Sequence, residues 1–228
     1  KRWKAVVRKY LIDENTMLAA GNCQTSQAMA IYYNIFEPAE RKAAFEQLIN
    51  LIEEQEYHLD VGVLGGRVLF HVLTEFGYSD LAFSMITRPD YPSYGNWIAR
   101  GATTLWEVFQ PEGSDRIGSL NHHFWGDISS WFTQALSGIR MAPHGEPNEV
   151  DFRPSFISRL THAEAFHIAP AGRIASAWER DEDDVIVLTV KLPSTMHGVI
   201  RLESGYVFED DLAYKAAESG TYRIHSIE

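Results

Sequence analysis

The sequence predicts a multidomain α and β protein, with helical hairpins up to about residue 140 and a small antiparallel β-sandwich after it. Apolar residues in the first part recur with the spacing of a helix face, and beyond residue 148 they alternate with a period of two. Pro143, Gly145 and Pro147 lie between these two regions and indicate a linker. We therefore expect one domain at residues 1–140 and a second at residues 141–228.

The predicted helices follow one another with short loops, an arrangement typical of antiparallel helical hairpins. Gly77 suits the end of one helix, and Pro38 suits the first turn of another. The helix beginning at Pro38 has a stripe formed by Phe45, Leu48, Ile49 and Ile52. The expected segments are 3–11, 25–36, 38–52, 67–76, 80–87 with Ser79 as its cap, 96–109 and 126–139. In the last of these, Ile128, Trp131, Phe132, Ala135, Leu136 and Ile139 share one face.

The predicted strands are shorter and are separated by turn residues. Ile186, Leu188 and Val190 alternate with more polar positions, as in a strand with one buried face. The other strand candidates are 150–157, 173–178, 198–202 and 220–227. Gly172 and the acidic run 181–184 are predicted to form turns, and the acidic run is more typical of a solvated turn than of a calcium site.

The charge balance argues against polyanionic partners. The 228 residues contain 31 acidic and 20 basic side chains, a formal net charge of −11. Such a protein repels nucleic acids and anionic membranes, and no stretch approaches the ~18 apolar residues of a membrane span. We expect no nucleic-acid partner, no membrane partner and a neutral ligand.

Several reactive sites have no signature in this sequence. A single cysteine, Cys23, excludes an internal disulfide and is predicted to be a buried thiol. His122 and His123 are adjacent and lack a third ligand at a standard spacing, so we predict no metal. The sequence also contains no phosphate loop and no dinucleotide fingerprint, so we predict no cofactor.

The segment from Tyr91 to Asp127 carries the residues most suited to chemistry. It places Glu107 among Thr103, Thr104 and Trp106, and the Asn121-His122 pair follows about one loop later. A carboxylate can act on a water molecule, flat rings can cover the apolar face of a sugar, and Asn and His can bind its hydroxyls. The pattern therefore favours a site for hydrolysing a sugar, with Glu107 as its leading catalytic candidate.

The residues near Glu107 have two possible roles, one in binding a ligand and one in the structure. Tyr94, Trp97 and Trp125 could stack on a sugar or could equally fill the core of a helical hairpin, and periodicity does not separate these roles. Asn121 and His122 could bind a ligand or could be capping groups on the surface. Glu107 on its own could be an exposed helix carboxylate.

The residues 91–107 and 118–126 together resemble the signature of bacterial α-L-rhamnosidases, inverting glycosidases with a six-hairpin (α/α)6 barrel. Its most specific stretch is Gly101 to Glu107 followed by Asn121-His122. The segments 22–27 and 57–65 are also similar to that barrel, and 160–163, 170–174 and Trp178 are similar to its C-terminal β-sandwich. The resemblance implies late barrel hairpins at residues 1–140 and the sandwich at residues 141–228.

The resemblance also implies roles for single residues. Glu107 would be the general base, His122 would contact the sugar, and Trp97 would lie in or near the sugar pocket, with Asn121, Tyr94 and Trp106 as further substrate-binding candidates. Position 94 departs from the family pattern because it carries Tyr where related sequences often have Trp, which puts the preferred sugar in doubt. The expected ligand is a small carbohydrate or a rhamnosylated glycoside.

One part of the expected machinery has no counterpart in this sequence. Inversion needs a second carboxyl group, roughly 6.5–9.5 Å from the base, to protonate the leaving oxygen. In the family this acid comes from an acidic motif upstream of the region that matches Lys1. The sequence also lacks an initiator Met and opens within a helical pattern, so we expect an N-terminal part of the same enzyme as a partner.

Two alternatives remain at this point. The chain could be a non-catalytic carbohydrate-binding or structural fragment, or part of a six-hairpin glycosidase with another sugar specificity. Because no general acid is found in this sequence, the fragment alone is expected to have little or no hydrolytic activity.

Overall fold

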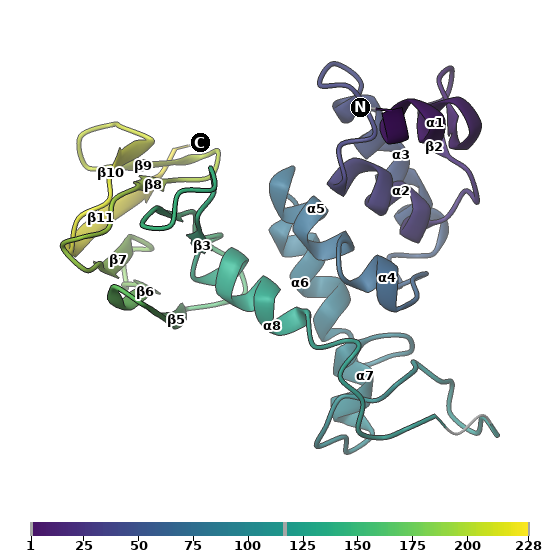
Figure 1. The fold of residues 1–228 in the computed structure, drawn as a ribbon. Coiled ribbons are helices and arrows are strands. Elements are labelled where there is room, and N and C mark those ends of the chain that lie inside the picture. The colour runs from purple at the N-terminus through teal and green to yellow at the C-terminus, as the bar shows by residue number, and fades with distance from the viewer. Residues whose placement is uncertain (1, 116–117, 228) are drawn as a thin grey trace. The chain divides into compact units, whose positions relative to one another are not determined.

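The computed structural model describes residues 2–115 and 118–227, which form two compact units, Lys1–Ile128 and Ser129–Glu228. The first unit is helical and the second consists mainly of strands (Figure 1). Compact packing and evolutionary domains need not share a border. The expected border between residues 140 and 141 therefore stays a prediction.

The first unit is built from short helices joined by turns. They are α1 (Arg2–Leu11), α2 (Gln24–Tyr32), α3 (Arg41–Glu54), α4 (Val63–Gly66), α5 (Leu69–Glu75), α6 (Ser79–Thr87) and α7 (Tyr94–Ala99). A two-stranded ribbon, β1 (Ile12–Asp13) with β2 (Leu18–Ala19), follows α1. Helices were predicted in each of these regions except that of α4.

The core of this unit lies among α2, α3 and α5. Ile31, Leu48, Ile52 and Leu69 are all fully buried there, which confirms most of the predicted stripe on α3. The buried side-chain amide of Gln27 joins neighbouring segments of the chain. Its Nε2 donates to the carbonyl oxygens of Met17 and Ala44, and its Oε1 accepts the N–H of Ala19. A buried amide satisfied in this way costs little stability and fixes one packing arrangement.

Helix ends largely follow the local sequence. Gly77 has φ +82°, and its N–H and that of Tyr78 donate to the carbonyl oxygens of Thr74 and Leu73, as expected of a glycine that ends α5. The predicted cap at Ser79 is wrong by one position, because Tyr78 precedes the first helical residue of α6. The third helix begins at Arg41 and not at Pro38.

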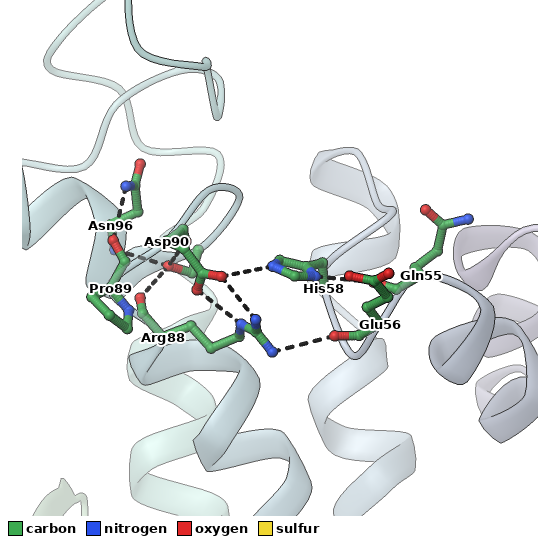
Figure 2. A network of polar contacts seen from close by, with 8 residues as sticks. Gln55, Glu56, His58, Arg88, Pro89, Asp90 and Asn96 are labelled. Carbon is green, nitrogen blue, oxygen red and sulfur yellow. Dashed lines mark hydrogen bonds and ion pairs between the residues drawn. The ribbon is translucent and has the colours of Figure 1, made fainter.

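A polar network ties the loop after α3 to the loop after α6 (Figure 2). The Asp90 carboxylate accepts two hydrogen bonds from Arg88, at 2.9 and 2.8 Å, and lies 2.9 Å from Nε2 of His58. The other ring nitrogen of His58 is 3.0 Å from the carbonyl oxygen of Gln55, and Arg88 also donates to the carbonyl oxygen of Glu56. These contacts hold the chain that leads into α7.

The prediction of a helix over residues 96–109 is wrong. The helix α7 spans Tyr94–Ala99, with Ser93 Oγ accepting the Asn96 N–H at its start. Gly101 takes φ +81°, which ends the helix, and the β-branched pair Thr103-Thr104 disfavours its continuation. Glu107 therefore lies in an irregular segment and not on a helix.

The last predicted helix is also different. It consists of α8 (Ile128–Trp131) and a π-helical turn, η1 (Phe132–Leu136), and Ile139 belongs to the strand that follows. The wider π-helical turn breaks the 3.6-residue period. As a result, Trp131, Ala135 and Ile139 are buried, but Phe132 of the predicted buried face is 39% exposed.

The second unit contains two sheets. One has the order β10-β8-β4-β3 and the other the order β5-β6-β7-β11-β9. The strands are β3 (Ile139–Met141), β4 (Val150–Phe152), β5 (His162–Ala169), β6 (Gly172–Arg180), β7 (Ile186–Lys191), β8 (Val199–Arg201), β9 (Tyr206–Phe208), β10 (Tyr214–Ala216) and β11 (Gly220–Ser226). The described pairings are antiparallel apart from β4 with β8 and the isolated bridge between Glu149 and His197.

One apolar core joins the two sheets, as in a β-sandwich. Phe152 and Ile200 of the first sheet share it with Trp178 and Leu188 of the second, all at most 2% exposed. Both predicted turns are found, one at 170–171 directly before Gly172, which has φ +130°, and one at residues 181–184. The strands β3, β5, β9 and β10 were not predicted.

The helix α1 has an unusual orientation, because its apolar residues face outward. Trp3, Val6 and Tyr10 are 63%, 51% and 69% exposed. Its polar side chains make the contacts, since Arg8 donates to both Glu40 carboxylate oxygens at 2.6 and 2.9 Å, and Lys4 donates to a main-chain carbonyl oxygen. Across the described residues, every helix is too short or too polar to cross a bilayer.

Candidate active site

Glu107 is held by the main chain of a neighbouring segment. Its N–H donates to the carbonyl oxygen of Ser119 at 2.8 Å, and its Oε2 accepts the N–H of Ser119 at 2.9 Å. Trp125 donates from Nε1 to the carbonyl oxygen of Glu107 at 2.9 Å. The carboxylate of Glu107 is half-buried, and its second oxygen, Oε1, makes no hydrogen bond with another described residue.

The same pairing brings the histidine segment next to Glu107. The N–H of His122 donates to the carbonyl oxygen of Leu105 at 2.8 Å, and Thr104 Oγ1 donates to the carbonyl oxygen of Leu120. Residues 104–107 and 119–122 therefore run beside each other as a hydrogen-bonded pair of segments. The structure thus brings together the two motifs that the sequence separates by a loop.

His122 accepts a main-chain hydrogen bond through one of its ring nitrogens. Its Nδ1 lies 3.3 Å from the N–H of Phe124 and accepts that hydrogen bond. This contact puts the proton of the neutral ring on Nε2, where it can be donated to a hydroxyl group. Asn121 is exposed, and its amide makes no hydrogen bond with the described residues, although its main chain contacts Ser119.

The aromatic residues of the motif lie behind this segment. Tyr94, Trp97 and Trp106 are 7%, 2% and 9% exposed. Trp97 stacks on Phe109 with ring centres 4.4 Å apart, and the Tyr94 hydroxyl donates to the carbonyl oxygen of Trp125 at 3.2 Å. Burial raises the pKa of Tyr94 well above its usual range. The rings form a packed layer and not an open platform.

Close approach of main chain and rings explains two of the glycines. A Cβ on Gly66 would overlap ring carbons of Trp125, and one on Gly95 would overlap the carbonyl groups of Thr87 and Arg88. Only glycine at these positions allows α4 to lie against Trp125 and α7 to lie against the end of α6. Gly66 thereby places α4 directly against the segment that follows His122.

A hollow of about 450 Å³ opens where α4 meets this segment. It is lined by Val63, Leu64, Arg67, His123, Phe124 and Asp127. We call it the α4 hollow. It adjoins the candidate site, since the rings of His122 and Phe124 are 4.1 Å apart and those of His122 and His123 are stacked at 5.2 Å. Glu107 is not among its lining residues.

The carboxylate of the α4 hollow has a histidine partner. Asp127 Oδ2 lies 3.1 Å from Nε2 of His71 on α5. Burial, and then the negative charge of Asp127, raise the pKa of Tyr32, whose ring lies 6.2 Å from that of His71. Arg67 makes no hydrogen bond or ion pair with another described residue.

Sequence reasoning missed the α4 hollow. Arg67 was expected only as the start of a helix, and Asp127 and Phe124 carried no motif of their own. More than fifty residues separate its two walls, and contacts of Gly66 with Trp125 and of His71 with Asp127 bring them together. In the described part of the chain, no group of three or more His, Cys, Asp or Glu side chains could hold a metal ion.

Known proteins with similar sequences have one name in common. The relatives include an alpha-L-rhamnosidase from Streptomyces avermitilis, 31% identical over 179 residues, which cover 76% of this chain and 17% of that protein. Another, from Alteromonas sp. (strain LOR), is 30% identical over 189 residues, 79% of this chain and 20% of the relative. The chain therefore spans about a fifth of the length of these curated relatives.

Solved structures agree in fold. The crystal structure of Streptomyces avermitilis alpha-L-rhamnosidase complexed with L-rhamnose matches 98% of this chain and 23% of its own length, with a TM-score of 0.85 and 26% identity. The alpha-L-rhamnosidase from Dictyoglumus thermophilum matches 99% of this chain and 28% of its own length, with a TM-score of 0.81 and 25% identity.

Family models match both parts of the chain. The bacterial alpha-L-rhamnosidase C-terminal domain matches residues 148–205. The bacterial alpha-L-rhamnosidase 6 hairpin glycosidase domain matches residues 1–136, more than half of the chain. These matches confirm the predicted fold class of late barrel hairpins followed by a β-sandwich. The chain belongs to the bacterial alpha-L-rhamnosidase family of six-hairpin glycosidases.

Proposed function

We propose that this chain is the C-terminal part of an α-L-rhamnosidase that removes terminal α-L-rhamnosyl residues from glycosides with inversion at the anomeric carbon. Family membership and the names of the relatives support the activity. The observation that carries the role of this chain is the anchored carboxylate of Glu107, whose Oε2 accepts the N–H of Ser119 while Oε1 makes no hydrogen bond with another described residue.

In the proposed reaction Glu107 is the general base. It accepts a proton from a water molecule whose oxygen forms a bond to the anomeric carbon. The bond from that carbon to the leaving oxygen breaks on the opposite face, and the leaving oxygen takes a proton from a carboxylic acid supplied by an N-terminal part of the same enzyme. Roughly 6.5–9.5 Å between the two carboxyl groups leaves room for the water.

The other residues position the sugar. His122 donates from Nε2 to a sugar hydroxyl, and the exposed amide of Asn121 binds a second one. Tyr94, Trp97 and Trp106 serve as the packed layer behind the sugar, a role that their burial favours over open stacking.

A single substitution tests the base. In the complete protein that contains this chain, Glu107→Gln keeps the shape of the side chain but removes its basicity. We expect kcat on an aryl α-L-rhamnoside to fall about 100- to 10,000-fold, the range for a general base. Glu112→Gln, an exposed position on the same segment, is the matched control and should leave kcat unchanged.

Two further measurements complete the test. NMR of the first product formed should show the β-anomer of rhamnose, and the α-anomer would exclude inversion. Turnover of Glu107→Gln close to that of the unsubstituted protein would exclude the base assignment. Rhamnose binding without hydrolysis by the complete protein would favour the non-catalytic alternative.

A further inference from the structure

We propose that the α4 hollow binds the sugar unit next to the terminal one, and that Arg67, Asp127 and Phe124 recognise it. The inference rests on the proposed function, because the hollow adjoins the site of His122. A sugar bound in the α4 hollow would make the enzyme prefer substrates in which the rhamnosyl group is attached to another sugar.

The position of the α4 hollow fits a neighbouring unit. Its wall residues His123 and Phe124 contact the ring of His122 at 5.2 and 4.1 Å between ring centres. Glu107 does not line it, so a ring bound there would lie beside the reacting carbon and not on it. A volume of about 450 Å³ is ample for one sugar ring with its hydration.

The lining has the chemistry of a sugar site. Phe124 and Leu64 are 47% and 58% exposed, and the Phe124 ring can cover the apolar face of a pyranose. Arg67 is an exposed donor with no hydrogen bond or ion pair to another described residue, and the Asp127 carboxylate is an acceptor. Hydroxyl groups both accept and donate, so a cation and a carboxylate in one hollow suit vicinal hydroxyls better than a bare aromatic leaving group.

The carboxylate of Asp127 is held in position by a histidine. Asp127 Oδ2 contacts Nε2 of His71, which fixes the direction of the carboxylate. The side chain of Asp127 is 27% exposed, so it remains accessible from the hollow. Gly66 packs directly against the Trp125 ring, which brings α4 next to the segment that carries Phe124 and Asp127.

Calorimetric titration of the complete protein tests the proposal. The two probes are L-rhamnose and a sulfur-linked rhamnosyl-glucose, which cannot be hydrolysed. We expect the disaccharide to bind about 10-fold more tightly than rhamnose, equivalent to about one charged hydrogen bond. Arg67→Ala and Phe124→Ala should each reduce this ratio toward one, whereas Phe124→Tyr, which keeps the ring, should preserve it. Arg2→Ala, an exposed arginine elsewhere, is the control for lost charge.

The outcomes separate the two proposals. If rhamnose binds but the disaccharide is no tighter, or if Arg67→Ala leaves the ratio unchanged, the second-sugar assignment is overturned while the proposed function stands. If Arg67→Ala weakens rhamnose itself as strongly as the disaccharide, the hollow holds the terminal sugar and the assignment is again overturned. If neither probe binds, both proposals are overturned.

Discussion

At the scale of single residues, Gly66 shows how the site depends on close packing. Its Cα lies so near the Trp125 ring that a methyl group has no room. We expect Gly66→Ala to lower the free energy of unfolding of the helical unit by about 1–3 kcal/mol, the usual cost of overpacking. Chemical denaturation followed by tryptophan fluorescence measures this cost.

The control for this substitution lies four residues earlier. Gly62 has no heavy atom within 4 Å of a built Cβ and an ordinary negative φ of −86°. Gly62→Ala should therefore be neutral or slightly stabilising. Equal effects of the two substitutions would contradict the contact between α4 and Trp125.

The sequence predicted single residues unevenly. It identified Glu107 and His122 as site candidates because a carboxylate among small hydroxyl residues and aromatic rings is a rare local pattern. The burial of Tyr94 and Trp97 was left open, since a ring that stacks on a ligand and a ring that fills a core have the same composition. Arg67 and Asp127 could not be paired, because no local pattern records which loops meet.

At the scale of elements, the network of His58, Arg88 and Asp90 joins two loops. The Arg88 guanidinium, and then His58, hold the pKa of Asp90 well below its usual range. A carboxyl group with a lowered pKa in the folded state stabilises the protein above its unfolded pKa of about 3.9. That contribution is lost as the pH falls through the folded value.

Asp90→Asn should reveal this contribution. At pH 7 we expect it to lower the free energy of unfolding by about 0.5–1 kcal/mol, a small value because the Asp90 side chain is half exposed. The difference from the unsubstituted chain should shrink as the pH drops below about 4. Asp60→Asn, an exposed aspartate with no side-chain partner among the described residues, is the control in the same pH series.

Elements were predictable where one local signal dominates. Gly77 ended α5 as expected, and the period of two located β7. The helix over 96–109 failed because apolar spacing outweighed Gly101 in the prediction, although the left-handed backbone at that glycine ended α7. The π-helical turn at Phe132–Leu136 was not predicted, since its wider period leaves no mark in composition.

At the scale of the whole molecule, α1 leaves an apolar surface. Trp3, Val6, Tyr10 and Leu11 are each at least 49% exposed on one short helix. Contiguous exposed apolar side chains commonly mark an interface. We expect the 228-residue chain on its own to self-associate at concentrations that leave a Trp3→Glu/Tyr10→Glu variant monomeric.

Sedimentation velocity across a concentration series measures the difference. Ile98→Glu removes an isolated apolar side chain that is 72% exposed on α7 and serves as the control. A chain that stays monomeric at every concentration, or self-association that persists in the double variant, would contradict a role for this surface. The change from helices to strands was predictable from the sequence. The outward apolar face of α1 was not, because amphipathic spacing does not tell which side of a helix meets the core.

The hydrogen bonds between residues 104–107 and 119–122 have a consequence for finding this pair elsewhere. They join the chain on both sides of the exposed tip at 111–115, so the geometry of Glu107 and His122 does not depend on how many residues form that tip. Natural insertions there would lengthen a protruding turn and leave the carboxylate and imidazole where they are. A search for comparable enzymes should fix the two paired segments and let the spacer between them vary freely.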